Sequence, residues 1–364
     1  MDLFESVPNF SEGRRPEVIS DIGAAVAPAF LLDADADVDH NRLVVSLAGS
    51  RSSVTDGLMA ATAEAVERID LRAHAGVHPR VGSADVVPII PLGSTSLETC
   101  RELAHAIGSL VWSELHVPVY FYGHGANKTL ADIRAGRARL DLGGPDLHPT
   151  AGAVCIGARH ALVAFNVILY GYDLVAARAL ARSIRESGAG LRGVQALVFP
   201  LSDDRVQLSM NLFRVDETTP SAVIAELERR GVSLGAQQVV GLCPAVAASS
   251  AADGRLLEGR LASAAAGVAA TRCDERGGEE MTLLASRLRR EAADLAALPA
   301  DEDAFLSAAE RAAALVHVLR AAHVADAELE GLLRVAAAGL RRALSAATES
   351  LYKARVEALD RRLA

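Results

Sequence analysis

The segment from residue 74 to residue 85 carries the side chains best suited to catalysis. It reads HAGVHPRVGSAD and brings together an imidazole at His78, a guanidinium at Arg80 and a carboxylate at Asp85. Histidine is the side chain whose ordinary pKa lies near neutrality, so His78 is a candidate general base. The glycines on both sides of it would let a ligand approach the backbone closely.

His74 and His78 also have the i, i+4 spacing of two zinc ligands on one helical face. Gly76 and Pro79 disfavour a helix at this place. We therefore interpret the segment as a rigid loop with a general base, and we expect no metal.

A second polar segment, residues 31–42, reads LLDADADVDHNR. Its alternating carboxylates are typical of calcium loops. An EF-hand, however, needs glycine at its sixth position and glutamate at its twelfth, and these positions counted from Asp33 are Val38 and Val44. In a strand–turn–strand arrangement Asp33 and Asp35 share one face, which puts two carboxylates side by side. A solvated turn without chemistry is the alternative.

Two further loops stand out. Residues 141–159 read DLGGPDLHPTAGAVCIGAR, without GxxxxGK[ST] or a helix-opening GxGxxG, so a cradle for nucleotide phosphates is not indicated. We expect this segment either to line a cleft between two α/β units or to be an ordinary linker. Residues 7–13, VPNFSEG, either take part in a site or place Ser11 or Glu12 in a helix-capping turn.

The elements that must position these loops follow from hydrophobic periodicity. The first part of the chain reads as β-α-β-β-α-β, extended by one helix and one strand, and the second part repeats the β-α-β-β-α-β order of a ferredoxin-like sheet. The expected strands are 3–7, 30–35, 43–48, 86–90, 117–122, 162–169, 194–199, 206–212 and 239–242, and the expected helices are 16–26, 54–69, 97–115, 174–187 and 220–230.

From about Met281 the composition changes to Ala, Leu, Arg and Glu without strand signals. We expect three helices there, with Asp301 or Asp303 capping the second and Asp326 the third, which reaches toward Leu363. The expected fold class is α/β (α+β), with two tandem ferredoxin-like sandwich subdomains, a cleft between them and an all-α helical segment. The expected domains are 1–160, 161–275 and 280–364.

Charge and composition exclude several classes of protein. The chain has 364 residues, 51% hydrophobic and 23% charged, enough to build a folded core. Its formal net charge is −9, and residues 280–364 hold 12 basic and 13 acidic side chains, so the first 279 residues carry −8. This balance argues against a nucleic-acid partner, because a phosphate backbone requires a broad basic surface. An anionic ligand must instead be bound by a local cluster of cations.

The location is also predicted from the sequence. The longest apolar runs fall short of the roughly 20 residues that cross a membrane, and no signal peptide precedes the first strand. Four cysteines lie far apart with no CxxC pair. These features predict a cytoplasmic protein without membrane contact.

Six ordered segments together resemble the formiminotransferase domain of the glutamate formimidoyltransferases, over residues of about 3 to 270. They are VPNFSEGR at 7–14, LLDADADVDHNR at 31–42, HAGVHPRVGSADVVPIIPL at 74–92, the 141–159 loop, LVAFNVIL at 162–169 and QQVVGLCP at 237–244. The resemblance implies two α/β subdomains with a tunnel between them, and a homodimer. It also implies transfer of the formimino group between N-formimidoyl-L-glutamate and tetrahydrofolate, the co-substrate, in histidine degradation.

The resemblance also implies roles for residues. His78 matches the general acid/base of the family, and Asp35 would be its electrostatic partner or a proton shuttle. Arg42, Arg80 and Arg159 are candidates for binding the carboxylates of glutamate and folate, although each could pair with a nearby aspartate instead. The expected folate contacts are Gly143, Gly144, Pro145, Asp146, Leu147, His148, Pro149, Thr150, Ala151 and Gly152.

Two departures leave alternatives open. The family usually has DFGP where this chain has DLGG at 141–144, which could loosen the packing of the pterin. The alternatives are therefore a folate-dependent one-carbon transferase with another donor or amine acceptor, and a non-catalytic folate-binding protein. The helical segment after residue 280 lacks the PGGGS-like motif of the cyclodeaminase domain found in some relatives, so we expect no cyclodeaminase activity.

Overall fold

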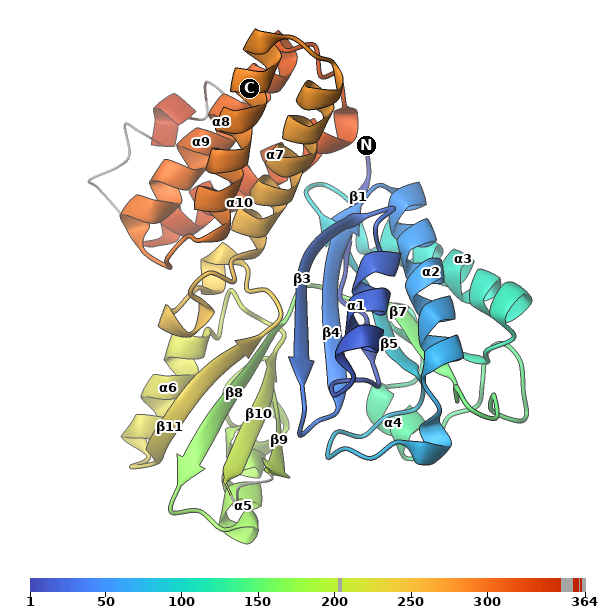
Figure 1. Cartoon of the computed structure of the whole chain (residues 1–364). Helices are drawn as coiled ribbons and strands as arrows, with labels where there is room; N and C mark the ends of the chain where they lie inside the picture. The colour runs from blue at the N-terminus through green and yellow to red at the C-terminus, as the bar shows by residue number, and fades with distance from the viewer. Residues whose placement is uncertain (202–204, 348–355, 360, 362–364) are drawn as a thin grey trace. The chain divides into compact units, whose positions relative to one another are not determined.

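A computed structural model describes residues 1–201, 205–347, 356–359 and 361 (Figure 1). By their contacts these residues form two units. Residues 2–161 make the N-terminal unit, and the described residues 199–201 group with it. Residues 162–198 and the described residues from 205 onward make the second unit, together with Met1. We describe each unit by itself.

The N-terminal unit is built on a seven-stranded sheet. Strands β3, β4, β1 and β5 pair antiparallel in that order, and β2 continues β1 between β4 and β5. Strands β7 and β6 extend the sheet parallel to β5. The strands are β1 (Leu3–Ser6), β2 (Asn9–Phe10), β3 (Phe30–Asp37), β4 (Arg42–Gly49), β5 (Ala84–Leu92), β6 (Val119–Gly123) and β7 (Val154–Ala158). The predicted ferredoxin-like order is confirmed for strands β1, β3, β4 and β5.

Strand β7 corrects the prediction that residues 141–159 are all loop. It lies between β5 and β6, where Cys155 is opposite both Val86 and Tyr120. The strand was not predicted from the sequence, because a parallel strand that is buried on both faces shows no alternation of apolar and polar residues. Its apolar run is also short and lies among glycines, which are typical of turns.

Two faces of this sheet have different coverings. Helices α1 (Pro16–Ala25), α2 (Arg51–Arg68) and α3 (Leu97–Leu115) pack over one face and form the main core with it (Figure 1). The second face carries the short helix α4 (Leu130–Arg134) and a small apolar cluster around Tyr122 and Cys155. Because side chains alternate along a strand, Leu43, Val45 and Leu47 enter the main core, which leaves Arg42 and Ser46 on the second face.

The second unit contains a four-stranded antiparallel sheet in the order β11-β8-β10-β9. This order is the predicted ferredoxin-like arrangement, and the sheet forms its own apolar core. Its strands are β8 (Val163–Tyr170), β9 (Val194–Pro200), β10 (Val206–Leu212) and β11 (Ser233–Val240), and its helices are α5 (Leu174–Ile184) and α6 (Pro220–Arg229).

The same unit continues into a run of helices, the first of which was not predicted. Its helices are α7 (Leu257–Glu275), α8 (Glu279–Ala296), α9 (Glu302–Ala321) and α10 (Ala327–Ala347). Helix α7 packs against α8 and α10, so it belongs with this segment rather than with the preceding sheet. The prediction missed it because alanines stand on both its buried and its less buried sides, which weakens the helical periodicity.

The predicted helix starts are correct for α9 and α10. Asp301 accepts a hydrogen bond from the backbone N–H of Ala304 (2.8 Å), and Asp326 accepts from those of Glu328 (2.9 Å) and Leu329 (3.1 Å). The third predicted helix is described as far as Ala347. Residues 348–355 and the predicted end near Leu363 lie outside the described residues. The fold class is confirmed, whereas the domain bounds and the cleft stay predictions.

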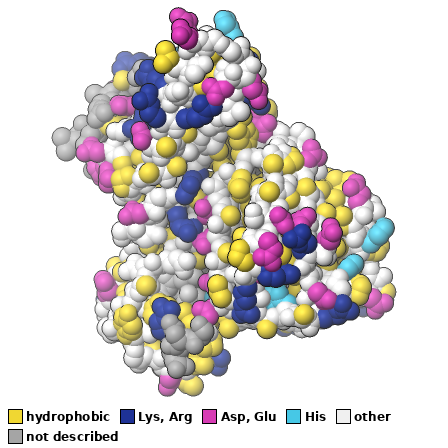
Figure 2. All heavy atoms as spheres, viewed as in Figure 1, with side chains coloured by type: hydrophobic (Ala, Val, Ile, Leu, Met, Phe, Trp, Pro, Cys, Tyr) yellow, Lys and Arg dark blue, Asp and Glu magenta, His cyan; other side chains and the backbone are white. Residues whose placement is uncertain are grey.

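The surface, the helices and the cysteines each bear on a sequence prediction. On the face drawn in Figure 2, acidic and basic side chains are interspersed. No helix within the described part of the chain combines the length and apolar character that crossing a membrane requires. All four cysteines are buried and carry free thiols.

Candidate active site

The loop that carries His78 joins a short 3-10 helix, Leu71–Ala73, to strand β5. Side-chain to backbone hydrogen bonds hold it. Asp85 Oδ1 accepts from the N–H groups of Val81 (2.6 Å) and Gly82 (3.4 Å). Arg80 Nη2 donates to the carbonyl oxygens of His78 (2.7 Å) and His40 (3.2 Å). These hydrogen bonds hold the backbone on both sides of His78.

The structure brings this loop together with the end of the 143–152 segment. Ser83 N donates to Ala151 O (2.9 Å), and Ala153 N donates to Val81 O (3.1 Å). Gly82 and Gly152 face each other in an isolated antiparallel bridge. The two loops that the sequence singled out independently thus form one structural junction.

Most of the 143–152 segment is exposed, and its own side chains shape it. His148 Nδ1 accepts a hydrogen bond from Ala151 N (3.0 Å). Gly143 adopts a φ of 74°, and a Cβ there would lie 2.7 Å from the ring of Trp112. Two residues before the segment, Asp141 accepts a hydrogen bond from Lys128 Nζ (2.7 Å). Folate contacts by residues 143–152 stay a prediction.

His78 lies in a cluster of rings. Its imidazole stacks on that of His40 with ring centroids 5.8 Å apart, and the ring of Phe199 is 6.1 Å away. His40 is only 1% exposed and meets Phe199 edge-on at 5.0 Å. Phe199 was not singled out from the sequence, where it is simply the last residue of an expected strand.

The His78 imidazole is neutral at physiological pH. Burial lowers its pKa to about 2, and the positive charges of Arg42 and Arg134 act in the same direction, followed by His40 and Arg80. A neutral imidazole has a free lone pair and can accept a proton. Its proton affinity is nevertheless low, because burial and the neighbouring cations disfavour the charged form.

Acidification is therefore expected to destabilise the unliganded protein through His78. The unfolded imidazole has a pKa near 6.5, whereas the folded one is lowered to about 2, so below pH 6.5 the unfolded state binds a proton that the folded state does not. Above about pH 6.5 the imidazole is neutral in both states and costs no stability. Below pH 6.5 the free energy of unfolding falls by up to ~1.4 kcal/mol per pH unit. Urea unfolding should be measured near pH 7.5 and near pH 5.5. Between these two pH values the free energy of unfolding should fall by about 1 kcal/mol less in His78→Gln than in wild type. Equal losses would contradict the assignment.

Asp35 lies on β3 opposite Val44, and its neighbour two positions on, Asp37, lies opposite Arg42. The structure places the carboxylates of Asp35 and Asp37 where their charges act on the Arg42 guanidinium. A direct partnership of Asp35 with His78 stays a prediction.

The three candidate arginines have different surroundings. Arg80 donates to backbone carbonyls within its own loop, as described above. Arg159 Nη1 donates to His160 O (2.9 Å), and the charge of Arg159 acts on the buried Tyr122 phenol, whose pKa burial raises to about 12. Arg42 Nε is buried and has no hydrogen-bond partner among the residues that the structure describes. Of the three, Arg42 has the clearest capacity for a ligand, and all three binding roles stay predictions.

Sequence reasoning missed Arg134. This residue ends α4, and its Nη2 pairs with Asp85 Oδ2 at 3.0 Å. The capping box of Thr129 and Asp132 is a recognisable sign of the helix. Nothing in the sequence relates Arg134 to Asp85, because the pair is 49 residues apart.

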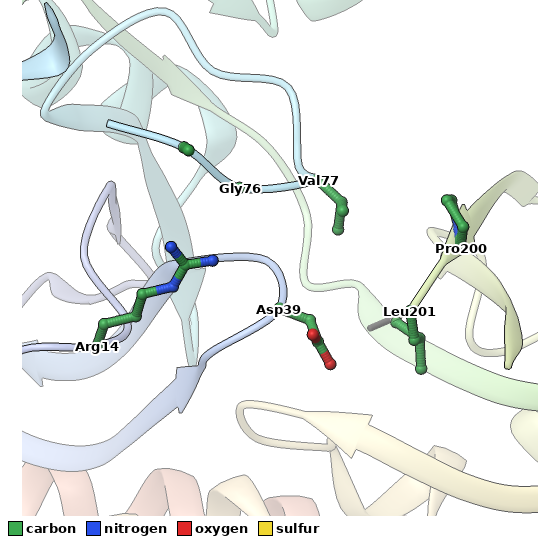
Figure 3. Close-up of a pocket in the computed structure, with 7 residues that line it drawn as sticks. Arg14, Asp39, Gly76, Val77, Pro200 and Leu201 are labelled. Carbon is green, nitrogen blue, oxygen red and sulfur yellow. The ribbon is translucent and has the colours of Figure 1, made fainter. Parts of the chain in front are cut away.

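An open pocket of about 440 Å³ lies beside the loop that carries His78 (Figure 3). Val77 and Asp39 point toward a space that Pro200 and Leu201 face from the other side. Its volume is typical of small-molecule sites, and its walls are mainly apolar with one cation and one carboxylate. The lining residues are Arg14, Asp39, Ala75, Gly76, Val77, Pro200 and Leu201.

Comparisons with known proteins show which family this chain resembles. Residues 3–159 match the family described as formiminotransferase domain, N-terminal subdomain. A glutamate formimidoyltransferase of Thermoplasma acidophilum is 36% identical over 300 residues, which covers 73% of this chain and 99% of that protein. One of Streptococcus pyogenes serotype M1 is 32% identical over 275 residues, covering 69% of this chain and 92% of that protein.

Longer relatives match the same part of the chain. A formimidoyltransferase-cyclodeaminase of Gallus gallus is 37% identical over 281 residues, which is 69% of this chain and 52% of that protein. The chain thus matches about half the length of this relative. The resemblance drawn from the six ordered segments is confirmed.

Proposed function

Since the chain belongs to the formiminotransferase family, we propose that it is a glutamate formimidoyltransferase. It would transfer the formimino group between N-formimidoyl-L-glutamate and tetrahydrofolate in histidine degradation. The observation that carries the proposal is the similarity to the Thermoplasma enzyme along nearly its whole length. The neutral His78 imidazole, held in a rigid loop beside a pocket, supports it.

The reaction needs one group that first accepts and then donates a proton. A neutral amine of tetrahydrofolate attacks the amidine carbon of the donor, and a C–N bond forms. His78 accepts the proton from the attacking nitrogen and then delivers it to the nitrogen of glutamate as its bond to carbon breaks. The products are 5-formimidoyltetrahydrofolate and glutamate, and no oxidant or reductant is required.

The cations around His78 make this exchange depend on the substrates. In the unliganded protein Arg42 and Arg134 lower the proton affinity of the imidazole. Bound carboxylates would offset these charges and raise the pKa of His78 toward the range useful for proton transfer. The pocket beside Val77 offers room for the co-substrate.

A direct assay tests the proposal. Purified protein with formimidoylglutamate and tetrahydrofolate should form a product that acid converts to the absorbing 5,10-methenyl compound. If folded protein forms no such product, the proposed donor and acceptor are wrong. Formyl-type donors and other amines, tested in parallel, show whether the altered 141–149 loop accepts another donor or acceptor. Tight folate binding without turnover on any donor would instead favour a non-catalytic folate-binding protein.

The same assay tests the expected lack of cyclodeaminase activity. That activity would release ammonia and form the methenyl product near neutral pH. We expect neither before acid is added.

We also propose a cytoplasmic homodimer without a metal cofactor. The free, buried cysteines and the lack of a helix suited to a membrane in the described residues support the location. Family resemblance supports the dimer, which sedimentation can test.

A further inference from the structure

Two guanidinium groups beside His78 have unused hydrogen-bond donors. Arg42 projects from β4 and Arg134 from α4, and the charges of both act on the His78 imidazole. Each has a buried Nε–H that finds no hydrogen-bond partner within the described parts of the chain. Their positive charges also repel each other.

This arrangement is unfavourable without a ligand. A buried donor without an acceptor loses its hydrogen bonds to water and gains none in return. Asp85 offsets part of the charge, because its Oδ2 accepts from Arg134 Nη2 at 3.0 Å while its Oδ1 holds the His78 loop. Asp37 and Asp35 also act on Arg42 through their charges. Within the described residues no carboxylate accepts a hydrogen bond from either Nε–H, so both donors are available to an anion.

We propose that Arg42 and Arg134 together bind the α-carboxylate of the glutamate-type donor beside His78, with Asp85 as the positioning residue that orients Arg134. This inference rests on the proposed function. A carboxylate has two oxygens and accepts charge-assisted hydrogen bonds from two guanidinium groups at once. It thereby satisfies both buried donors and separates two like charges.

The position of the pair favours the donor over the tail of folate. In formimidoylglutamate a single carbon separates the α-carboxylate from the nitrogen that bears the transferred group. A carboxylate held next to His78 therefore places the reacting carbon near the base. The carboxylates of tetrahydrofolate lie beyond its aminobenzoyl spacer, far from the attacking amine.

Binding would also control the reactivity of His78. The groups that face the imidazole are Arg42 from β4, Arg134 from α4, His40 from the β3–β4 turn and Arg80 from its own loop. The carboxylates of Asp35, Asp37 and Asp85 act on the Arg42 guanidinium. A bound carboxylate adds a negative charge among these cations, so His78 becomes a better base when the donor is present.

Steady-state kinetics of Arg134→Gln, compared with Arg137→Gln, test the clamp. Arg137 is the matched control, because it follows the same helix and forms an exposed ion pair with Asp132. We expect Arg134→Gln to raise KM for formimidoylglutamate by about 10- to 100-fold, while KM for tetrahydrofolate changes by less than about 3-fold. Arg134→Lys keeps the charge but loses the Nε–H, so it should recover only part of the effect.

A readout without turnover separates this inference from the proposed function. Calorimetry should show L-glutamate binding to wild type and Arg137→Gln but about 10-fold or more weaker binding to Arg134→Gln. In NMR titrations, L-glutamate should raise the pKa of His78 in wild type, and Arg134→Gln should raise it in the free protein. Asp85→Asn, which keeps the shape of the side chain, should weaken glutamate binding in the same direction.

Several outcomes would overturn the inference. Unchanged glutamate binding in Arg134→Gln would remove Arg134 from the site, even if the transferase assay succeeds. If Arg134→Gln weakens the binding of tetrahydrofolate but not of tetrahydropteroate, the two arginines bind the carboxylates of folate instead. If glutamate binding depends on Arg134 but no formimino transfer occurs, the clamp stands and the proposed reaction fails.

Discussion

Replacing His78 by alanine is expected to reduce kcat by at least about 10²-fold, because general acid–base catalysis contributes roughly 10²- to 10⁴-fold. The attacking amine would lose the group that accepts its proton, and the departing nitrogen would lose its proton donor. Folate binding should largely survive, since the backbone of the loop is held by Asp85 and Arg80 rather than by the imidazole. Product formation and calorimetry with folate measure the two effects separately.

His317→Ala is the control for this experiment. His317 is exposed on α9, outside the N-terminal unit, and its removal should leave kcat unchanged. A similar kcat in His78→Ala and wild type would remove His78 from the mechanism. Loss of folate binding together with activity would instead indicate that the imidazole maintains the loop.

The second large effect is expected at Gly152, where the two loops of the site meet. Gly152 adopts a φ of 71°, and a Cβ there would lie 2.2 Å from the carbonyl oxygen of Val81. Because the obstructing atom belongs to the backbone, no side chain can rotate away. Gly152→Ala should lower the free energy of unfolding by about 3 kcal/mol, from positive φ and steric overlap together. Activity should fall too, because relief of the overlap shifts the loop that carries His78.

Gly136→Ala separates the two contributions. Gly136 has a similar φ of 68°, but an added Cβ would meet nothing within 4 Å. Its substitution should therefore lower the free energy of unfolding by only about 1 kcal/mol. Urea unfolding of both variants measures the difference, and equal losses would contradict a tight junction at Gly152.

Elements with strong local signals could be predicted from the sequence. The helix from Leu97 to Leu115 has the predicted bounds, because Ser96 caps its start and apolar residues recur at helical spacing. Both sheets follow the predicted β-α-β-β-α-β order, since each unit alternates strand and helix periods. Strand β7 and helix α7 were missed because buried parallel strands and alanine-rich helices lack a polar face to reveal their period.

The candidate site shows the same limit. His78 could be proposed from its residue type and loop, and its acid/base role from family resemblance. The pairing of its loop with Ala151, the ring of Phe199 and the ion pair between Asp85 and Arg134 could not, because each joins residues far apart in the chain. Long-range contacts leave no periodic trace in a single sequence.

The sequence by itself determined the order of the elements, the family and a candidate histidine for proton transfer. Only the tertiary structure decided the protonation of that histidine and which arginines keep donors for a ligand. The net charge of −9 required a local cationic cluster for any anion, and the fold places the charges of Arg42 and Arg134 where both act on His78. The physical reason is that burial and neighbouring charges set proton affinity, and both arise only when distant segments pack together.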